Sequence, residues 1–452
     1  MDLSALADGT DEKHARRVAD LTLRLGALML GAGGSAAETT AAMLRLTHTY
    51  GLEHAHVDVT YTSIIISTPR GPDEDPLTAM RTVRSAGRDY HRLGLVQALV
   101  ASLASDPVPV SEAHRRFAAI ARLPRRYDDW VLTLSHGGTG LGISLMLGAQ
   151  AAEIVLATLS TMLSFRLPHV LGRHGMPSFF TQVIGAAIPT ALALVIVALG
   201  GWEPVAGLGI SPSRIVAAGI VVLVAGISTM GAARDLIDGF YVTAGARSFD
   251  VMSATLGIVL GVSGTLWVGR EVGIPGYISH QNLVGAFVPV QLLGAAVSAA
   301  SNAVSNQATP RAVGICFGAG AGAWGVKTVA EQGLGIGYGA ACGVAAVVVA
   351  FVAQLVAGRS AIPDQAIAIP AVVSLVPGSM VYRGLTGLFD AQDLTTLSGA
   401  VGELLGAAGV GLGLAFGIAL GSWLGRPLRL AWNEGARWFE NLAVDRFNPR
   451  KN

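Results

Sequence analysis

The chain has 452 residues, of which 52% are hydrophobic and only 13% charged, and it carries 58 glycines and a formal net charge of +1. About a quarter of the residues of an ordinary soluble domain are charged, so this composition argues against a purely soluble protein and indicates a polytopic membrane protein. A nearly neutral chain without a Lys/Arg block also gives no sign of a nucleic-acid partner.

The first 128 residues predict a soluble α/β domain that lies in the cytoplasm. The opening segment mixes acids and bases and lacks the apolar core of a cleavable signal peptide. Residues 18–30 have helical spacing, but Asp20 and Arg24 interrupt the run. A bilayer takes about 20 apolar residues to cross. We therefore expect a soluble helix here and not a membrane span.

Further elements of this domain follow from caps and periodicity. Ser35 or a neighbour is expected to cap a second helix that runs to Tyr50, with Gly51 as its stop. β-Branched residues alternate at the beginning of 56–68, which predicts a strand or a hairpin. Two more helices are expected at 88–105 and 111–123, just before the first membrane span.

Apolar stretches follow one another from Trp130 onward, separated by short polar breaks. Most of them approach the roughly 20 residues that a membrane helix needs, and we predict ten spans. They cover about 130–150, 152–170, 178–200, 213–233, 249–269, 282–301, 311–329, 335–357, 366–388 and 397–424.

Ten spans place both ends of the chain on the same side of the cell membrane. Arginines gather on both flanks, and the positive-inside rule assigns such flanks to the cytoplasm. These are Arg115, Arg116, Arg122, Arg125 and Arg126 before the first span, and Arg426, Arg429 and Arg437 after the last. We therefore predict a cytoplasmic domain at 1–128, membrane segments at 129–269 and 280–425, and a cytoplasmic tail at 426–452.

The membrane region contains a repeated pattern. The sequence Leu-Val-Ala-Gly at 223–226 returns as Leu-Val-Pro-Gly at 375–378, which is 152 residues later. The same offset relates the approximate starts of the first and fifth spans in the two halves, from Trp130 to Asn282 and from Phe249 to Val401. Two repeats of five spans each would have opposite orientations, as in many secondary transporters. The alternative is that Gly/Ala-rich helices simply resemble one another.

Three segments stand in one order along the chain. They read "GAGGSAAETTAAMLRLTHTYGLEHAHVDVTYTSIIIS" at 31–67, "STMGAARDLIDGFYVTAGARSFDVMSATLGIVLGV" at 228–262 and "IPAVVSLVPGSMVYRGL" at 369–385. They resemble the N-terminal, middle and C-terminal signatures of the threonine/serine exporter family.

This resemblance implies a cytoplasmic domain, ten membrane helices and ion-driven export of threonine and serine, without a cofactor. One departure is Ala225, which stands where the family usually has a proline, so the first repeat is expected to be less strongly kinked. Related two-component members are associated with export of dicarboxylates such as succinate, so the resemblance does not fix the substrate.

The stretch "SLVPGSMVYRG" at 374–384 interrupts a predicted span. Proline lacks the backbone donor that a helix needs and clashes with the preceding turn, and glycine permits a close approach. In a transporter, such a break offers N–H groups and a helix N-terminus to a carboxylate. We predict that the substrate is bound by Pro377, Gly378, Ser379 and Arg383 of the second half and by Gly226 and Asp235 of the first. The alternative is a structural kink with Arg383 reaching the surface.

Acidic residues at or beside the spans are candidates for proton coupling. Asp235 and Asp238 are three apart and share a helical face at the end of the fourth span. Glu153 lies at the start of the second span and Glu403 early in the tenth. A charge at the bilayer centre costs about 2.5–3.5 kcal/mol on insertion scales, so such residues carry a functional hypothesis. Solvated ion pairs or interfacial positions are the alternatives.

Two function classes stay open beside the exporter of small hydrophilic amino acids. One is a dicarboxylate exporter, and the other is a membrane-anchored enzyme that uses the N-terminal domain. No Walker-type loop is present for ATP, so a proton antiporter is expected, driven by about 2.3 kcal/mol per charge per 100 mV. The expected partners are the substrate, membrane lipid and the proton, and no catalytic residue, metal or cofactor is predicted. The sequence leaves open whether the chain forms a homo-oligomer.

Overall fold

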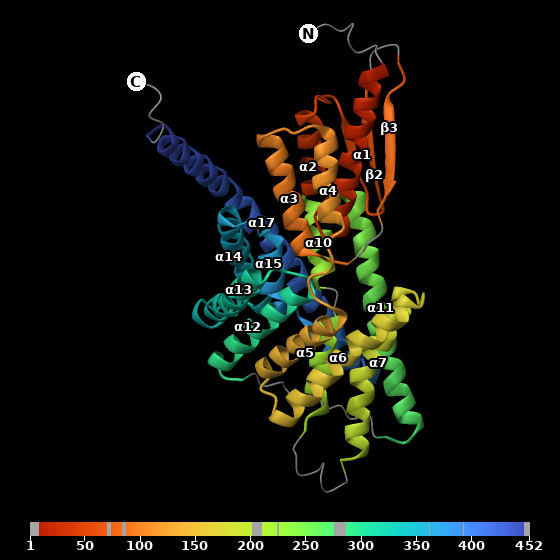
Figure 1. Cartoon of the computed structure of the whole chain (residues 1–452). Helices are drawn as coiled ribbons and strands as arrows, with labels where there is room; N and C mark the ends of the chain where they lie inside the picture. The colour runs from red at the N-terminus through yellow and green to blue at the C-terminus, as the bar shows by residue number, and fades with distance from the viewer. Residues whose placement is uncertain are drawn as a thin grey trace. The chain divides into compact units, whose positions relative to one another are not determined.

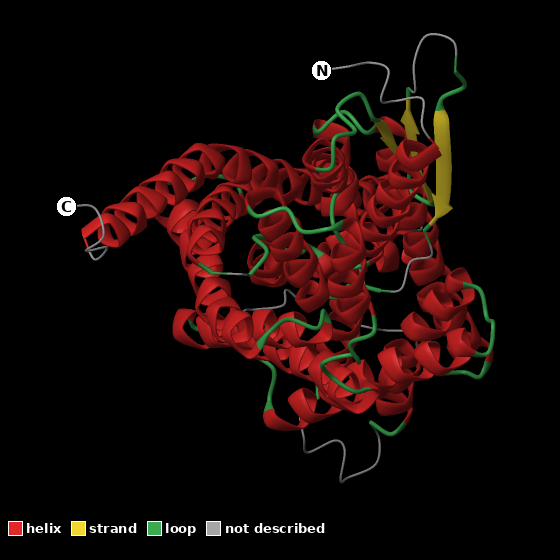
Figure 2. Cartoon of the chain, turned by 45° about the horizontal axis from the view of Figure 1, so that its top comes forward, coloured by secondary structure: helices red, strands yellow, loops and turns green. Residues whose placement is uncertain are grey.

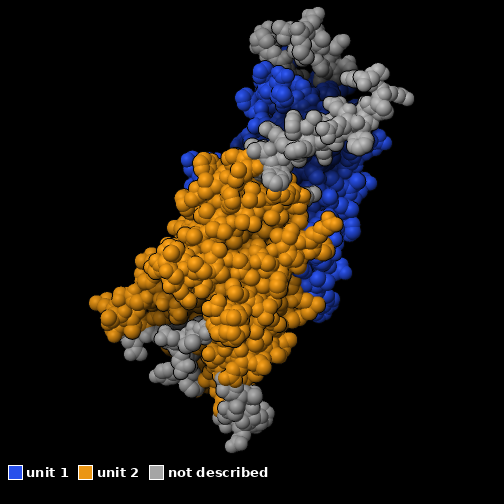
Figure 3. Space-filling model, turned by 90° about the vertical axis from the view of Figure 1, so that its left-hand side faces the viewer, with its two compact units in different colours: residues 1–132, 231–253, 304–309 blue, residues 133–230, 254–303, 310–452 orange. Residues whose placement is uncertain are grey.

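The computed structural model describes residues 9–69, 74–83, 87–200, 210–223, 226–274, 286–360, 362–391 and 393–446. The chain divides into two compact units, which Figure 3 distinguishes by colour. Unit 1 comprises residues 1–132, 231–253 and 304–309, and unit 2 comprises residues 133–230, 254–303 and 310–452. The N-terminal region is thus grouped with a later segment that contains Asp235 and Asp238.

Unit 1 combines helices with one small sheet (Figures 1 and 2). The strands form an antiparallel sheet in the order β1-β2-β3, and His56 pairs with Ser67 while Ser63 pairs with Thr82. The N-terminal elements are α1 (Gly9–Gly31), α2 (Ala36–Thr49), β1 (His56–Val59), β2 (Ser63–Thr68), β3 (Leu77–Thr82), α3 (Tyr90–Ser105) and α4 (Val110–Ala121).

Most of these elements agree with the sequence predictions. Ser35 is the N-cap of α2, and its hydroxyl accepts a hydrogen bond from the Glu38 N–H at 3.2 Å. Tyr50 ends this helix, and Gly51 follows with φ +83°, a backbone angle that favours glycine. The predicted hairpin is β1 and β2. Strand β3 was not predicted, because its mixed sequence "LTAMRT" follows a polar loop and shows no apolar alternation.

The core of unit 1 lies between the sheet and the helices. Ile64 and Ile66 of β2 are fully buried and alternate with half-buried neighbours, and Met43 of α2 is equally buried. Phe240, from the later segment of unit 1, packs against the same cluster. Full burial of a phenylalanine contributes about 1.5–3 kcal/mol, and the half-buried Phe240 supplies part of that, so segment 231–253 takes part in the hydrophobic core of this unit.

Unit 2 is helical throughout the part of it that the structure describes. Its helices, some of which extend into unit 1, are α5 (Asp129–Met146), α6 (Ala151–Arg173), α7 (Ser178–Ala198), α9 (Pro212–Leu223), α10 (Gly226–Ile237), α11 (Tyr241–Glu271), α12 (Val288–Ser305), α13 (Pro310–Thr328), η2 (Val329–Gly333), α14 (Tyr338–Arg359), α15 (Gln365–Val372), η3 (Val373–Leu375), α16 (Gly378–Asp390) and α17 (Leu394–Arg446).

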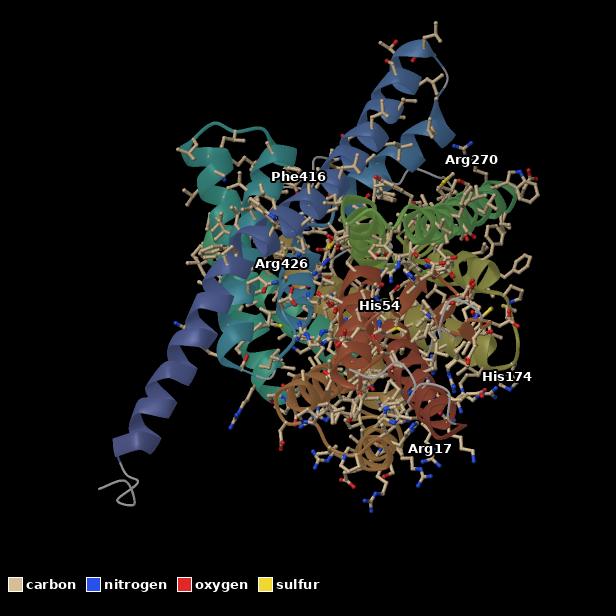
Figure 4. The ribbon with its side chains drawn as sticks, turned by 90° about the horizontal axis from the view of Figure 1, so that it is seen from above. Arg17, His54, His174, Arg270, Phe416 and Arg426 are labelled. Atoms are coloured by element: carbon tan, nitrogen blue, oxygen red, sulfur yellow. The ribbon has the colours of Figure 1, made fainter. Side chains whose placement is uncertain are left out.

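The described residues contain seven helices that are long and apolar enough to cross a membrane. An eighth results if the segments Gln365–Leu375 and Gly378–Gly384, bent by 43°, count as one span. Large apolar side chains are exposed along these helices, as Leu412 and Phe416 are on α17, where Figure 4 labels Phe416 and the charged Arg426 further along. Lipid is the solvent that suits such surfaces. The chain is therefore a polytopic helical membrane protein.

Helices α14 and α17 pack closely through small residues. A Cβ on Gly417 of α17 would lie 2.5 Å from the Gly343 carbonyl oxygen, and a Cβ on Gly421 would lie closer still to the Val347 carbonyl oxygen. Small residues let membrane helices approach to backbone contact. The "SHGGTG" stretch of α5, residues 135–140, is also closely packed, but against side chains, since a Cβ on Gly137 would lie 2.6 Å from Cγ of Met162.

The single offset of 152 residues holds for only part of the chain. It relates the starts of α10 and α16, but α5 and α12 begin 159 residues apart, at Asp129 and Val288. The connection from α7 to α9 covers residues 199–211, whereas that from α14 to α15 covers only 360–364. This shorter connection accounts for the decrease of the offset from 159 to 152 residues. Asn282 and Ala225, which the sequence analysis singled out, lie outside the described residues.

Candidate functional site

The break in the ninth predicted span is present in unit 2. Helix α15 gives way to the single 3-10 turn η3, and α16 begins at Gly378 after Pro377. Pro377 has φ −80° and ψ 49°, and the Gly378 N–H donates to the Val376 carbonyl at 2.8 Å. This is the geometry of an inverse γ-turn. A tight turn thus replaces the helical hydrogen bonds that the proline cannot make.

A buried hydroxyl lies beside this break. Ser374, in the 3-10 turn, is 6% exposed, and its Oγ has no hydrogen-bond partner among the described residues. Buried polar atoms are nearly always paired, so an orphan of this kind indicates water or a ligand at the site. Ser379 follows in the first turn of α16 and is half-buried. The break therefore combines a helix N-terminus with two hydroxyl groups.

The break packs directly against the first half of the membrane region. A Cβ on Gly378 would lie 2.8 Å from the Cα of Val221, near the end of α9, and closer still to one of its methyl groups. Val221, Met230, Leu375 and Val376 belong to one buried cluster. Gly226 begins α10, so both predicted signatures mark helix starts. The structure brings the Pro377 break next to the end of α9.

Arg383 does not point freely into this site. Its guanidinium forms an ion pair with the Glu403 carboxylate of α17 at 3.2 Å, and about a third of each side chain is exposed. Two residues that the sequence analysis assigned to different roles are therefore partners. This pair joins α16 to α17 and occupies the guanidinium, so Arg383 has to leave Glu403 before it can bind a substrate carboxylate.

Glu153 is fully buried and satisfied by several donors. Its carboxylate accepts the Gln150 N–H at 2.7 Å and the Ser211 N–H at 2.5 Å, and it pairs with Arg214 at 3.0 Å. The first of these bonds is half of a capping box at the start of α6. In this state Glu153 ties the beginning of α6 to the beginning of α9.

Asp235 and Asp238 belong to a buried ionic cluster in unit 1. Asp235 has no exposed surface, accepts the Ala36 N–H at 3.2 Å and pairs with Arg247 at 3.1 Å. Arg234 pairs with Glu38 at 2.6 Å and lies 3.9 Å from Asp238. Asp235 thus sits at the N-terminus of α2, where a carboxylate is favoured by the helix dipole.

The pKa values of two side chains in unit 1 are shifted by their surroundings. Asp235 lies beyond the end of the span predicted at 213–233, and burial raises the pKa of its carboxyl, although Arg247 opposes this shift. Burial and the hydrogen bond to Asp250 raise the pKa of Tyr61 to about 12, so its hydroxyl stays protonated. Of these two side chains, Asp235 is the carboxyl group whose raised pKa favours the binding of a proton.

The predicted site residues therefore lie in separate groups. Pro377, Gly378 and Ser379 form the break, Arg383 pairs with Glu403, and Glu153 stands apart with Arg214. The aspartates belong to unit 1. Sequence reasoning missed Arg247, Glu38 and Lys327 as functional candidates. Lys327 carried a usable signal, because an isolated lysine in an apolar run is uncommon, whereas Arg247 and Glu38 gave none without the fold.

Comparison with known families covers nearly the whole chain. A family model described as "Putative threonine/serine exporter" matches residues 20–268, and a second, described as "Threonine/Serine exporter, ThrE", matches residues 291–424. No solved structure matches the chain.

Similar proteins agree with these models. A "Probable threonine/serine exporter" of Mycobacterium tuberculosis is 33% identical over 433 residues, which are 94% of this chain and 80% of the relative. The "Threonine/serine exporter" of Corynebacterium glutamicum is 29% identical over 432 residues, 93% of this chain and 85% of the relative. A "Probable succinate transporter subunit YjjP" of Klebsiella aerogenes is 22% identical over 262 residues, 57% of this chain and 96% of the relative.

Proposed function

The chain belongs to the threonine/serine exporter family, and on that premise we propose that it exports threonine and serine across the cell membrane. The observation that carries this proposal is the family match over both halves, together with two relatives of that name that align with more than nine-tenths of the chain. Membership of a transporter family argues against an enzymatic role for the N-terminal domain.

The membrane region is built from two inverted repeats of five spans, with an interrupted span fourth in each repeat. The helix bounds support this arrangement. The helix starts at 212 and 226 correspond to those at 365 and 378, and both second helices begin at a glycine. The interrupted span of the first repeat ends at 233, before Asp235. An odd number of spans per repeat forces opposite orientations, and interrupted helices near the midplane are where such transporters bind their substrates.

The substrate site lies at the break around Pro377 and Gly378. The N-terminus of α16 and the hydroxyls of Ser374 and Ser379 suit a carboxylate, because both supply donors and the helix dipole favours negative charge. The orphan hydroxyl of Ser374 supports a ligand at this position. Arg383 serves the same carboxylate once its pair with Glu403 opens. Gly226 lines the site from the first repeat.

Export is driven by the proton motive force through carboxylates that are paired with arginines. Asp235 is the first candidate because its pKa is raised and its partner Arg247 can stabilise the deprotonated form. Asp238, Glu403 and Glu153 are the other candidates. Each is paired with an arginine, so protonation of the acid would release that arginine and change the local packing.

Efflux from loaded cells tests the proposed function. Cells take up a threonine- or serine-containing dipeptide, hydrolyse it, and release the amino acid faster when this chain is expressed. Succinate-loaded cells serve as the comparison, because one relative is named a succinate transporter subunit. Faster release of succinate and unchanged release of threonine would favour the dicarboxylate alternative. Unchanged release of both would exclude an exporter of either class.

We expect collapse of the proton gradient to abolish the threonine efflux that depends on this chain. The gradient supplies about 2.3 kcal/mol per charge per 100 mV, and the carboxylates described above offer sites for the proton. Efflux is measured with an uncoupler while cellular ATP is held constant. Efflux that continues at the same rate would rule out proton coupling while leaving the substrate assignment untouched.

Both termini and the soluble N-terminal domain are expected on the cytoplasmic side. A cysteine at Glu74, before β3, should resist membrane-impermeant thiol reagents in intact cells, in a background without Cys316 and Cys342. A cysteine at Leu394, which is 84% exposed at the start of α17, should be labelled. Permeabilised cells, in which both react, provide the control. The reverse labelling pattern would overturn this topology.

A further inference from the structure

Lys327 occupies an unusual position in unit 2. The sequence contains only three lysines, Lys13, Lys327 and Lys451, and Lys327 belongs to the membrane helix α13, where it is 7% exposed. A buried ammonium in an apolar helix needs specific partners. The side chains around Lys327 are therefore groups of the protein that bind an ammonium.

Three side chains surround the Lys327 ammonium. Its Nζ lies 4.5 Å from the centre of the Trp324 ring and 4.7 Å from that of the Tyr338 ring. The Glu331 carboxylate pairs with it at 2.5 Å. Two aromatic faces and one carboxylate form the usual environment for a bound organic cation. We call Trp324, Tyr338 and Glu331 the ammonium box.

Helix ends hold this box in place. Trp324 is 8% exposed, and its indole N–H donates to the Gln291 side chain of α12 at 2.9 Å. Glu331 lies in the π-helical turn η2, where the Leu334 N–H bonds to the Val329 carbonyl, and Tyr338 begins α14. The π-helical turn ends α13, a common place for such turns. Glu331 remains about one-third exposed, so the box is open to a ligand at the carboxylate.

We propose that the ammonium box is a binding site for a primary ammonium group. Lys327 occupies the box in this state, and the ammonium group of the exported amino acid occupies it during transport. A zwitterion can insert between the two charges of the existing pair. Its ammonium replaces that of Lys327 beside Glu331 and the aromatic rings, while its carboxylate pairs with the displaced Lys327. Charge is balanced before and after this exchange, and the flexible lysine stem permits it.

This inference rests on the proposed export of amino acids, and it adds a second contact point beyond the Pro377 break. The proposed topology puts the C-terminal end of α13 and the start of α14 at the outer face. An exported amino acid would therefore meet the box after it leaves the break. A dicarboxylate has no ammonium, so it would not occupy this site, and the box favours an amino acid over succinate.

Removal of the lysine side chain should leave a vacant box that a small amine can fill. We expect methylammonium to raise the Tm of purified full-length Lys327→Ala in detergent, whereas the parent and equal concentrations of sodium show no shift. L-Threonine should move the methylammonium titration of this variant to higher concentrations, and 2,3-dihydroxybutanoate, which lacks the ammonium, should not. Lys327→Ser provides a second vacant variant if the alanine variant does not fold.

Matched controls separate the box from general amine binding. Adding Glu331→Gln or Trp324→Ala to Lys327→Ala should abolish the methylammonium shift, and adding Tyr338→Phe, which keeps the ring, should preserve it. An equal shift in the parent, no shift in either vacant variant, or a shift that survives Glu331→Gln would overturn the ammonium box. These measurements need no transport. A chain that exports threonine but shows no shift disproves the box alone, a shift without threonine competition disproves that the exported amino acid uses the box, and only absent threonine efflux disproves the proposed function.

Discussion

Replacement of Gly378 by valine is expected to lower threonine efflux by about 10- to 100-fold at matched expression, since small displacements of a binding geometry cost this much. A Cβ at this position would lie 2.8 Å from the Val221 Cα, a backbone atom that cannot rotate away. Overpacking of this kind typically costs about 1–3 kcal/mol. The break would therefore separate from α9, and the donors at the start of α16 would move with it.

The neighbouring atoms supply the controls for this variant. Val221→Ala removes the methyl groups that the new side chain would meet, so Gly378→Ala combined with Val221→Ala should recover part of the efflux lost in Gly378→Ala. A Cβ on Gly314 of α13 would have no other atom within 4 Å, so Gly314→Ala should transport like the parent. Pro377→Ala should also lose transport, because it restores a backbone donor and favours a continuous helix. If Gly378→Val and Pro377→Ala both transport normally, the break is a packing kink, and the site must be sought around Asp235 and Glu403.

Apolar periodicity and backbone chemistry were enough to locate most of the elements. Within the described residues each predicted span overlaps a helix or a helix pair, because some twenty apolar residues in a membrane protein have no other regular structure available. Seven of these helices, or eight spans with the bent pair, are long and apolar enough to cross a membrane, and those at 130–150 and 213–233 are not among them. The interruption at Pro377 follows from the missing donor of proline, and the cap at Ser35 from its hydroxyl. These features are local, so a single sequence contains them.

Pairing between distant residues could not be predicted in the same way. Arg383 and Glu403 were assigned separate roles, yet they are partners across α16 and α17. Asp235 is predicted at the end of a membrane span, but the sequence does not predict its partners, which are the Ala36 N–H and Arg247. Side-chain pairs depend on how helices pack, and a Gly/Ala-rich sequence allows many arrangements. Strand β3 likewise depends on its partner β2 and has no pattern of its own.

Loss of either partner in the Asp235–Arg247 pair is expected to lower the free energy of local opening in unit 1 by about 3–5 kcal/mol. This is the usual cost of leaving one member of a buried pair without its partner. Arg247→Ala should be the more severe change. It leaves a carboxylate with no exposed surface, whereas the arginine freed by Asp235→Ala is 17% exposed at its side chain and keeps the Gly34 carbonyl and the Tyr61 ring nearby. Hydrogen exchange of the Ala36 amide in the full chain measures this opening in Arg247→Ala, which keeps the Asp235 acceptor of that N–H. In the variants that lack Asp235, the opening is measured at the Thr39 amide, which donates to the Ser35 carbonyl in the first turn of α2 at 3.0 Å.

The size of the effect can be separated from general destabilisation by two comparisons. Glu12→Ala breaks the exposed Arg16–Glu12 pair of α1 in the same unit and should change Ala36 exchange very little, because exposed pairs contribute about 0.2–1 kcal/mol. In the double variant Asp235→Ala with Arg247→Ala, the loss of opening free energy should be smaller than the sum of the losses in the two single variants, since the double variant leaves no unpaired charge behind. Ala36 exchange that stays at the parental rate in Arg247→Ala would contradict the pair. If the opening is observed and threonine efflux falls with it, then the cluster that joins residues 231–253 to the N-terminal helices is required for transport as well as for folding.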